Sequence, residues 1–309
     1  MKRLLSVLSV LLFFGSAFLG ITVFQPTAHG QGQFVGPDTC KGCHEPYYDS
    51  YRVSVHGKKA IPNAPANREA CESCHGSGTA HVNAGGGKGT IINFDKKTNP
   101  DKKAGQCLGC HEESQHLAFW NLSAHQSAGV SCDGCHSAHV GGPKNLKASQ
   151  PELCLDCHRS TNFQVNKQSH HPIREGKVSC TNCHDPHGTT APRMVKADSI
   201  NDLCYKCHMD KRGPFMWDHP PVEENCMICH AVHGSNHLRL LDKKMPEICQ
   251  SCHDWSRHPG TPYTRADSFQ RPYVGGSPSN KLVGRSCLNC HTNVHGSNGP
   301  GTNGLRFVR

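Results

Sequence analysis

Ten copies of the pattern Cys-x-x-Cys-His constrain this 309-residue sequence more than any other feature. Together they use all 20 cysteines. Cys-x-x-Cys alone also occurs in zinc sites and redox dithiols, but neither kind of site requires a histidine after every second cysteine. One fixed spacing also disfavours a disulfide scaffold, in which cysteine spacings vary. The pattern therefore predicts ten covalently attached haem c groups.

In such a motif the two thiols form thioethers with the haem vinyl groups, and the histidine binds the iron as its proximal ligand. The expected thioether residues are Cys40, Cys43, Cys71, Cys74, Cys107, Cys110, Cys132, Cys135, Cys154, Cys157, Cys180, Cys183, Cys204, Cys207, Cys226, Cys229, Cys249, Cys252, Cys287 and Cys290. The expected proximal ligands are His44, His75, His111, His136, His158, His184, His208, His230, His253 and His291.

The histidines outside the motifs supply candidates for the sixth position of each iron. Two of them end the pattern aromatic-x-x-Ser-x-His, three precede proline, and the others follow a proximal histidine by three to six residues. The distal candidates are His56, His81, His125, His139, His171, His187, His219, His233, His258 and His295. His170 and His237 remain alternatives to His171 and His233, and a solvated surface histidine is the alternative for any one candidate.

Chain geometry restricts which iron a trailing histidine can reach. Imidazole–metal bonds are about 2 Å long, so the Cα atoms of two ligands on opposite faces of a haem lie roughly 12 Å apart. Three extended residues span at most about 10–11 Å. We therefore expect His139, His187 and His233 to bind a neighbouring haem and not the haem of the motif just before each of them.

The motifs alternate in kind along the chain. The fifth, seventh and ninth follow an acidic residue and an aliphatic one, and a His-Pro pair comes after each. The fourth and sixth follow Val-Ser and carry a trailing histidine. This alternation indicates about five two-haem modules in a linear array. The expected fold is a multihaem cytochrome c, with short α-helices and long loops wrapped round a linear haem array and very little β-structure.

Composition agrees with a chain organised by cofactors, because only 35% of the residues are hydrophobic and a normal side-chain core needs more. The basic and apolar segment 1–30 is expected to be a signal peptide with an approximate cleavage site, an uncleaved anchor being the alternative. Residues 31–309 then form the decahaem domain. The net charge of +9 is expected to neutralise haem carboxylates, and no nucleic-acid motif accompanies it.

The sequence resembles the MtrA/DmsE-type decahaem cytochromes over nearly the whole of residues 31–309. The resemblance rests on the motif count and order, on Trp120-x-x-Ser-x-His125, on Gly-x-Val-Ser-Cys180-x-x-Cys-His-x-Pro-His187-Gly, and on repeated His-Gly-Ser. It implies a bis-histidine haem wire inside or beneath an outer-membrane β-barrel porin. It also implies a periplasmic location at the outer membrane, with periplasmic electron carriers and a surface multihaem cytochrome or reductase as partners. The expected function is electron transfer without catalysis.

Three other functions fit the motif count. A multihaem reductase needs an iron with an open coordination position, and every motif here ends in histidine. A filament of polymerised cytochromes would use haem contacts between subunit ends. A soluble periplasmic shuttle would have the same haems without a porin partner.

Overall fold

The secondary structure of this computed structural model consists of short helices joined by loops. The structure describes residues 33–139, 142–253 and 287–308. The α-helices are α1 (Pro37–Val53), α2 (Glu72–His75), α3 (Thr79–Asn83), α4 (Pro100–His111), α5 (Ala124–Ser127), α6 (Glu152–Leu155), α7 (Arg159–Val165), α8 (Cys180–Cys183), α9 (Ile200–Tyr205), α10 (Pro220–Glu224), α11 (Glu247–Gln250) and α12 (Gly301–Leu305). The 3-10 turns are η1 (Pro65–Asn67), η2 (Gln115–Leu117), η3 (Trp120–Leu122), η4 (Cys132–Gly134), η5 (Pro143–Asn145), η6 (Pro192–Met194), η7 (Met209–Lys211), η8 (Cys226–Ile228), η9 (Leu238–Leu240) and η11 (Cys287–Asn289).

Each Cys-x-x-Cys-His motif folds as one helical turn. In eight motifs the amide of the histidine donates to the carbonyl of the first cysteine at 2.9–3.1 Å, and the other two motifs lie inside α1 and α4. Residues one turn apart on a helix share a face, so this turn brings the first thiol and the imidazole together. The local backbone thus presents both attachment groups on one side.

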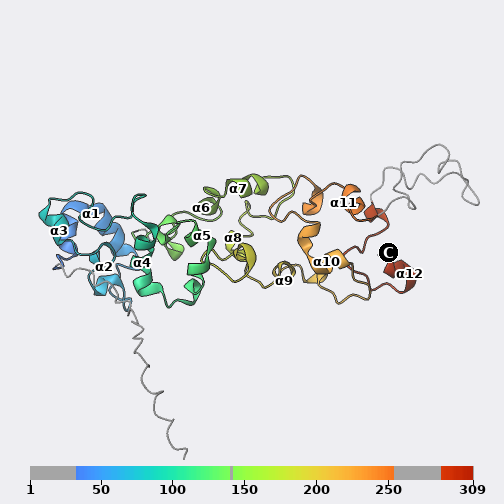
Figure 1. Cartoon of the computed structure of the whole chain (residues 1–309), viewed down its shortest axis with the longest axis horizontal. Coiled ribbons are helices and arrows are strands. Elements are labelled where there is room, and N and C mark those ends of the chain that lie inside the picture. The colour runs from blue at the N-terminus through green and yellow to red at the C-terminus, as the bar shows by residue number, and fades with distance from the viewer. Residues whose placement is uncertain (1–32, 140–141, 254–286, 309) are drawn as a thin grey trace, which may run out of the picture.

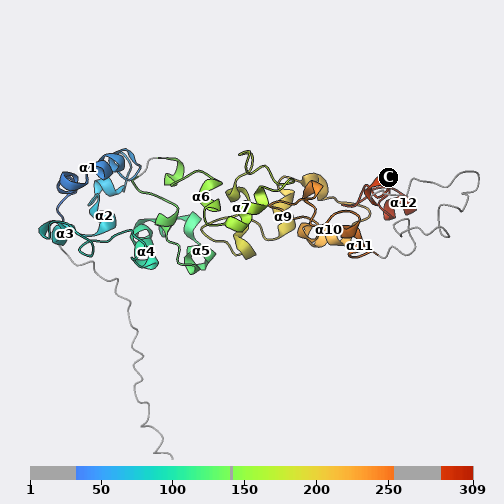
Figure 2. The ribbon, with the colours of Figure 1, turned by 90° about the horizontal axis from the view of Figure 1, so that it is seen from above.

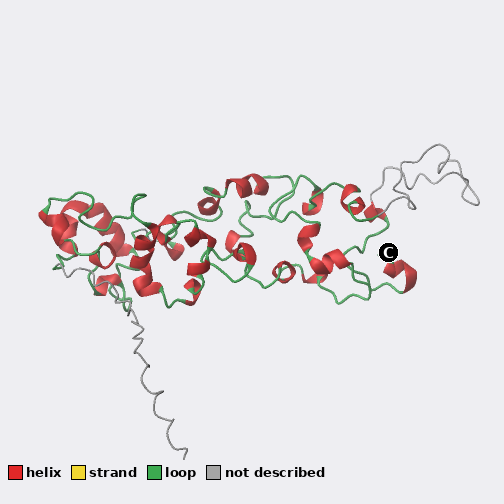
Figure 3. Cartoon of the chain, in the orientation of Figure 1, coloured by secondary structure: helices red, strands yellow, loops and turns green. Residues whose placement is uncertain are grey.

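The molecule is elongated, and the chain advances along its long axis in sequence order. The colour runs from blue at one end to red at the other in both perpendicular views (Figures 1 and 2). Helices alternate with loops along the whole length, and no strand occurs in the described part (Figure 3). The expected fold class is therefore confirmed, including its low content of β-structure.

Apolar packing is sparse over the described ranges. The hydrophobic core cluster contains Leu155, Val165 and Ile173, with Val178 packed against it. Other buried apolar side chains, such as Tyr51, lie apart from this cluster. A cluster of this size cannot hold an elongated chain together, so other interactions must order the loops.

None of the helices among the described residues is both long enough and apolar enough to cross a membrane.

Candidate functional site

Imidazole pairs recur along the molecule, and each pair joins one proximal histidine to one distal candidate. Nine pairs have ring centroids 5.9–6.3 Å apart. The pairs are His44–His81, His75–His139, His111–His56, His136–His187, His158–His125, His184–His233, His208–His171, His230–His295 and His253–His219. Two imidazoles that share one metal at about 2 Å each have centroids about 6 Å apart, so the spacing fits an iron held between them.

The trailing histidines do not face the motif that precedes them. His187 lies against His136 at 6.1 Å, although His184 is only three residues away in sequence. His233 likewise lies against His184 at 6.2 Å and not against His230. This arrangement is the one that the reach of a three-residue segment requires. Each trailing segment consequently connects its own even-numbered motif to the even-numbered motif before it, two motifs back in the sequence.

Hydrogen bonds at Nδ1 fix the tautomer of many of these rings. His136 Nδ1 donates to Lys144 O at 2.8 Å, and His125 Nδ1 donates to Pro186 O at 2.9 Å. The other rings whose Nδ1 lies against a backbone carbonyl are His75, His171, His184, His219, His230 and His291. A proton on Nδ1 leaves the lone pair of Nε2 free for a metal, and the carbonyl makes the ring a stronger ligand.

The spare histidines differ from the paired ones in their contacts. His170 Nδ1 lies 2.6 Å from Lys167 O, and its Nε2 lies 3.0 Å from Glu175 Oε1. Both ring nitrogens are therefore engaged, and the hydrogen bond that His170 donates to the Glu175 carboxylate raises the pKa of His170. His116 and His237 face no partner ring in the described part of the chain. The sequence preference for His171 over His170 thus corresponds to a difference in geometry.

Burial keeps many of the paired imidazoles neutral. It is the largest cause that lowers the pKa of seven of them, which are His56, His139, His187, His219, His230, His233 and His295. A histidine must be deprotonated to bind a metal. The environment therefore favours the protonation state that ligation needs.

Strained turns position the proximal ring in the even-numbered motifs. Lys144, Arg193 and Arg239 all have φ near +60°, between 58° and 62°. Their carbonyls accept the Nδ1 proton of the proximal histidine of the fourth, sixth and eighth motifs. A left-handed residue other than glycine costs about 1–3 kcal/mol and persists only where its surroundings fix it. The sequence analysis missed these turns, although a Pro-Lys or Pro-Arg pair begins two of them.

Thiol contacts connect the ten motifs in sequence order. Burial and the first cysteine of the next motif together raise the pKa of the first cysteine in motifs one, three, five, seven and nine, so these thiols lie near each other. The second cysteines of motifs two and three, four and five, six and seven, and eight and nine influence each other electrostatically. Contact with Cys107, for example, lowers the pKa of Cys132 to about 7. The thiols of neighbouring Cys-x-x-Cys-His motifs are thus close together from the first motif to the tenth.

A buried carboxylate organises the N-terminal end, and the sequence analysis also missed it. Glu72, between the two cysteines of the second motif, is only 4% exposed. It accepts backbone N–H bonds from Val35, Gly36 and Gly78 at 2.7–3.1 Å. Three backbone donors compensate the desolvation of the carboxylate. Glu72 thereby fixes the segment before α1 against the second motif.

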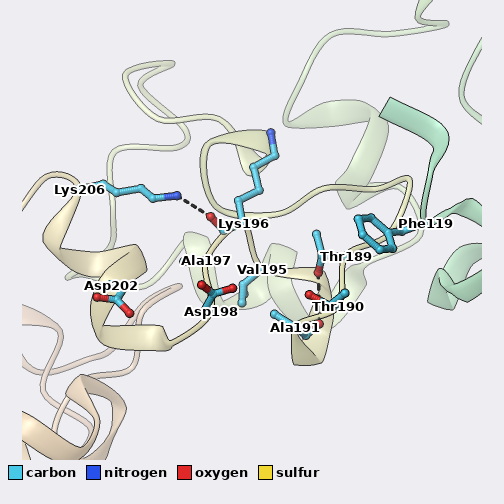
Figure 4. A pocket seen from close by; sticks show the side chains of 10 residues that line it. All are labelled: Phe119, Thr189, Thr190, Ala191, Val195, Lys196, Ala197, Asp198, Asp202 and Lys206. Atoms are coloured by element: carbon cyan, nitrogen blue, oxygen red, sulfur yellow. Dashed lines mark hydrogen bonds between the residues drawn. The ribbon is translucent and has the colours of Figure 1, made fainter. Parts of the chain in front are cut away.

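A cavity of about 450 Å³ adjoins the sixth motif (Figure 4). Phe119, Val195 and Asp198 line it, together with two lysines, Lys196 and Lys206. The amide of Lys196 donates to Cys183 O at 2.9 Å, which places the cavity beside that cysteine. Burial raises the pKa of the Cys183 thiol, and the ammonium groups of Lys206 and Lys196 oppose that rise. The cavity thus offers cations next to an attachment site.

Two expectations lie outside the described residues. These are the signal peptide at 1–30 and the distal candidate His258, in the range 254–286. Every other predicted site residue is described.

Comparisons with known proteins agree with this geometry. A family model for the doubled CXXCH motif matches residues 125–163, 170–213 and 219–258. Each match contains one even-numbered motif and the odd-numbered motif after it.

Sequence similarity to individual proteins covers most of the chain. The multiheme cytochrome MtrA of Shewanella baltica is 37% identical over 287 residues, which cover 90% of this chain and 84% of that protein. The high-molecular-weight cytochrome c of Nitratidesulfovibrio vulgaris is 23% identical over 69% of this chain and 43% of its own length. The dissimilatory sulfite reductase MccA of Wolinella succinogenes is 22% identical over 66% of this chain, but only 34% of that enzyme is covered.

Proposed function

Because this chain belongs to the family of MtrA-type multihaem cytochromes, we propose that it carries electrons across the outer membrane along ten bis-histidine haems. Electron transfer by covalent haem c is the function of the family, and the number of haems and the route across the membrane are the parts that we add. Haem supplies the redox chemistry, since each iron holds or releases one electron. The polypeptide supplies the ligands, the order of the sites and the partner surface.

The repeated imidazole pair is the observation that carries the proposal. Nine proximal histidines face a second imidazole at a spacing that fits one iron. The rings that donate from Nδ1 to a carbonyl leave Nε2 for the metal. We assign these pairs as the axial ligands, with the two cysteines of each motif as thioether residues. His258 remains a sequence-based candidate for the tenth iron, whose proximal ligand is His291.

The thiol contacts support an ordered file of haems. First cysteines meet within each pair of motifs, and second cysteines approach between pairs. The attachment edges of successive haems would therefore lie next to each other, from motif one to motif ten. Lys196 and Lys206, in the cavity beside Cys183, are suited to neutralise haem carboxylates there.

Family membership supports an outer-membrane porin as the partner. The elongated outline of the chain suits a position inside or beneath a barrel (Figure 1). A barrel with a polar lumen would shield the loops from lipid, where unpaired backbone groups are costly. Periplasmic carriers and a surface cytochrome or reductase would meet the two ends of the file. We place the exported protein in the periplasm, at the outer membrane.

An enzymatic function has one observation behind it, the partial likeness to a sulfite reductase. Such chemistry needs an iron with an open axial position. In the nine pairs that the structure describes, a second imidazole lies where it would occupy that position. These pairs favour an electron carrier over a reductase. A high-spin ferric EPR signal in the purified protein would favour the reductase.

Two measurements test the proposal. Intact mass should exceed that of the processed chain by roughly 6 kDa, because ten thioether-bound haems survive denaturation. In liposomes loaded with a redox dye, the cytochrome together with its porin should let an external reductant bleach the dye, and the cytochrome alone should not. Eight haems or fewer, with free thiols, would contradict the stoichiometry. Failure to co-purify with any barrel, with no transmembrane transfer, would leave a soluble shuttle.

A further inference from the structure

His56 pairs with the proximal histidine of the third motif, and His125 pairs with that of the fifth. These two distal histidines share a local structure but differ in one contact. His56 and His125 both end the pattern aromatic-x-x-Ser-x-His, and the serines, Ser54 and Ser123, are 1% and 0% exposed. His125 Nδ1 donates to Pro186 O at 2.9 Å. His56 Nδ1 is buried and has no hydrogen-bond partner. The two sites form a matched pair within one molecule.

The acceptor for His125 comes from a segment that approaches through a glycine. Gly188 follows His187, and a Cβ added there would lie 2.3 Å from Phe119 O. Only a residue without a side chain can pack so closely beside the segment that carries His125. Glycine also follows His233 and His295, and the carbonyls just before those two histidines accept from His171 and His219.

At the third motif the sequence breaks this pattern. Valine, at position 140, follows His139, where the three other segments have glycine. Val140 itself lies outside the described residues. A side chain would be incompatible with a close approach of the kind seen at Gly188, and this sequence difference coincides with the missing acceptor at His56 Nδ1.

The partner ring of His56 has no acceptor either. Among the described residues none accepts a hydrogen bond from Nδ1 of His111. Of the nine described pairs, His56–His111 is the one in which neither ring donates to an acceptor or lies beside a carboxylate. The Arg68 guanidinium also lies 3.8 Å from Cys110 Sγ, in the same motif as His111. Both features disfavour the more positive, ferric state of an iron held there.

We propose that the haem bound by His111 and His56 has a higher reduction potential than the matched haem bound by His158 and His125, and so retains an electron at the boundary between the first and second modules. A hydrogen bond from Nδ1 makes an imidazole a stronger donor and stabilises ferric iron, and this site lacks that bond. The expected difference is about tenfold in the ferric–ferrous equilibrium, which corresponds to about 59 mV for one electron. The inference rests on the proposed bis-histidine ligation.

An EPR-monitored redox titration of the holoprotein can separate these two sites. The angle between the imidazole planes sets the anisotropy of a low-spin ferric signal, and planes near 90° give the most anisotropic one. His56–His111 at 84° and His125–His158 at 73° are the steepest of the nine described pairs, the next being 55°. The highly anisotropic signal should therefore titrate in two components at different potentials. If both components titrate together, the inference fails although the ligation stands.

Two ligand variants assign the components. His56→Met should abolish the component of higher potential, and His125→Met the component of lower potential. The opposite assignment would overturn the inference. A titration in which neither variant alters the highly anisotropic signal would instead refute the ligation itself.

A glycine variant covers the case in which a ligand variant does not fold. Gly188→Val puts a side chain against Phe119 O and should displace the carbonyl of Pro186, which raises the potential of the lower component towards that of the higher one. Gly176→Val is the control, because Gly176 also has a positive φ but a Cβ there meets nothing within 4 Å. Equal effects of the two substitutions, or none from Gly188→Val, would contradict the proposed cause.

Discussion

The N-terminal region, residues 33–111, and the repeat region, residues 142–253, hold the same motifs by different means. In the first, α1 and α4 have 17 and 12 residues, and the buried Glu72 carboxylate binds three backbone amides. In the second, no α-helix exceeds 7 residues, and left-handed turns hold the proximal rings. The N-terminal region thus relies on longer helices and a buried carboxylate, whereas the repeat region combines short helices and a small apolar cluster around Val165 with carbonyls that hold the proximal rings.

The largest effect should come from removing a distal ligand in the repeat region. His171→Ala should convert one low-spin iron to high-spin and destabilise that region by about 2–4 kcal/mol, because a metal link is lost. EPR and denaturant unfolding measure the two changes. His170→Ala, at the preceding position, is the matched control. It should leave the EPR spectrum unaltered, since the His170 ring forms hydrogen bonds with Lys167 O and the exposed Glu175. If the two variants exchange these effects, the assignment of His171 is wrong.

Acid should weaken the repeat region before the N-terminal region. Burial lowers the pKa below the usual 6.5 for one histidine of the N-terminal region, His56, and for four of the repeat region, which are His187, His219, His230 and His233. A base with a depressed folded pKa adds stability above its unfolded pKa, and that stability is lost as the pH falls from 6.5 through the folded pKa. Hydrogen exchange resolved by region, at pH values from 7 to 4, checks this. Equal loss of protection from exchange in the two regions would contradict the predicted difference in acid sensitivity.

Neutralising the buried carboxylate should loosen only the N-terminal region. Glu72→Gln keeps the shape but weakens the acceptor for Val35, Gly36 and Gly78, and should cost about 1–3 kcal/mol. Faster hydrogen exchange at the amides of Val35, Gly36 and Gly78, with unchanged exchange in the repeat region, would show this. Glu113→Gln, at an exposed position, serves as the control. No difference between the two variants would mean that the hydrogen bonds to Glu72 contribute nothing measurable to the stability of the N-terminal region.

The smallest effect should come from the ion pair that joins the N-terminal region to the fourth motif. Lys103 Nζ lies 3.2 Å from Asp133 Oδ2, and the two side chains are 11% and 21% exposed. A double-mutant cycle with Lys103→Met and Asp133→Asn should give a coupling energy of about 1 kcal/mol. The exposed pair Lys41–Glu45 should give less than about 0.5 kcal/mol in the same cycle. Equal coupling energies would show that burial does not strengthen the inner pair.

The fold class and the recurrence of the sites could be predicted from sequence because one covalent pattern dictates both. The reach of three residues also indicated that His187 cannot share a metal with His184, and the structure places His187 against His136. Which proximal ring each distal histidine meets could not be predicted, because such pairs are up to 65 residues apart, as for His230 and His295.

Backbone acceptors escaped the sequence analysis for a different reason. The carbonyl of Lys144 or of Pro186 is chemically the same as every other carbonyl, so only its position makes it functional. Glu72 was missed because it occupies a variable position inside a motif that was examined for cysteine and histidine. The substitution of valine for glycine after His139 was visible in the sequence, but its meaning required the contact at Gly188.

The alternation of thiol contacts makes the molecule extensible. First cysteines meet in one kind of junction and second cysteines in the other, so a segment that carries two motifs begins and ends with the same kind of junction. If such a segment is removed or duplicated, first cysteines still meet first cysteines and second cysteines still meet second cysteines. If a single motif is removed or added, a first cysteine would meet a second cysteine. Length can therefore change in steps of two haems while both termini, and the proteins that dock on them, stay as they are.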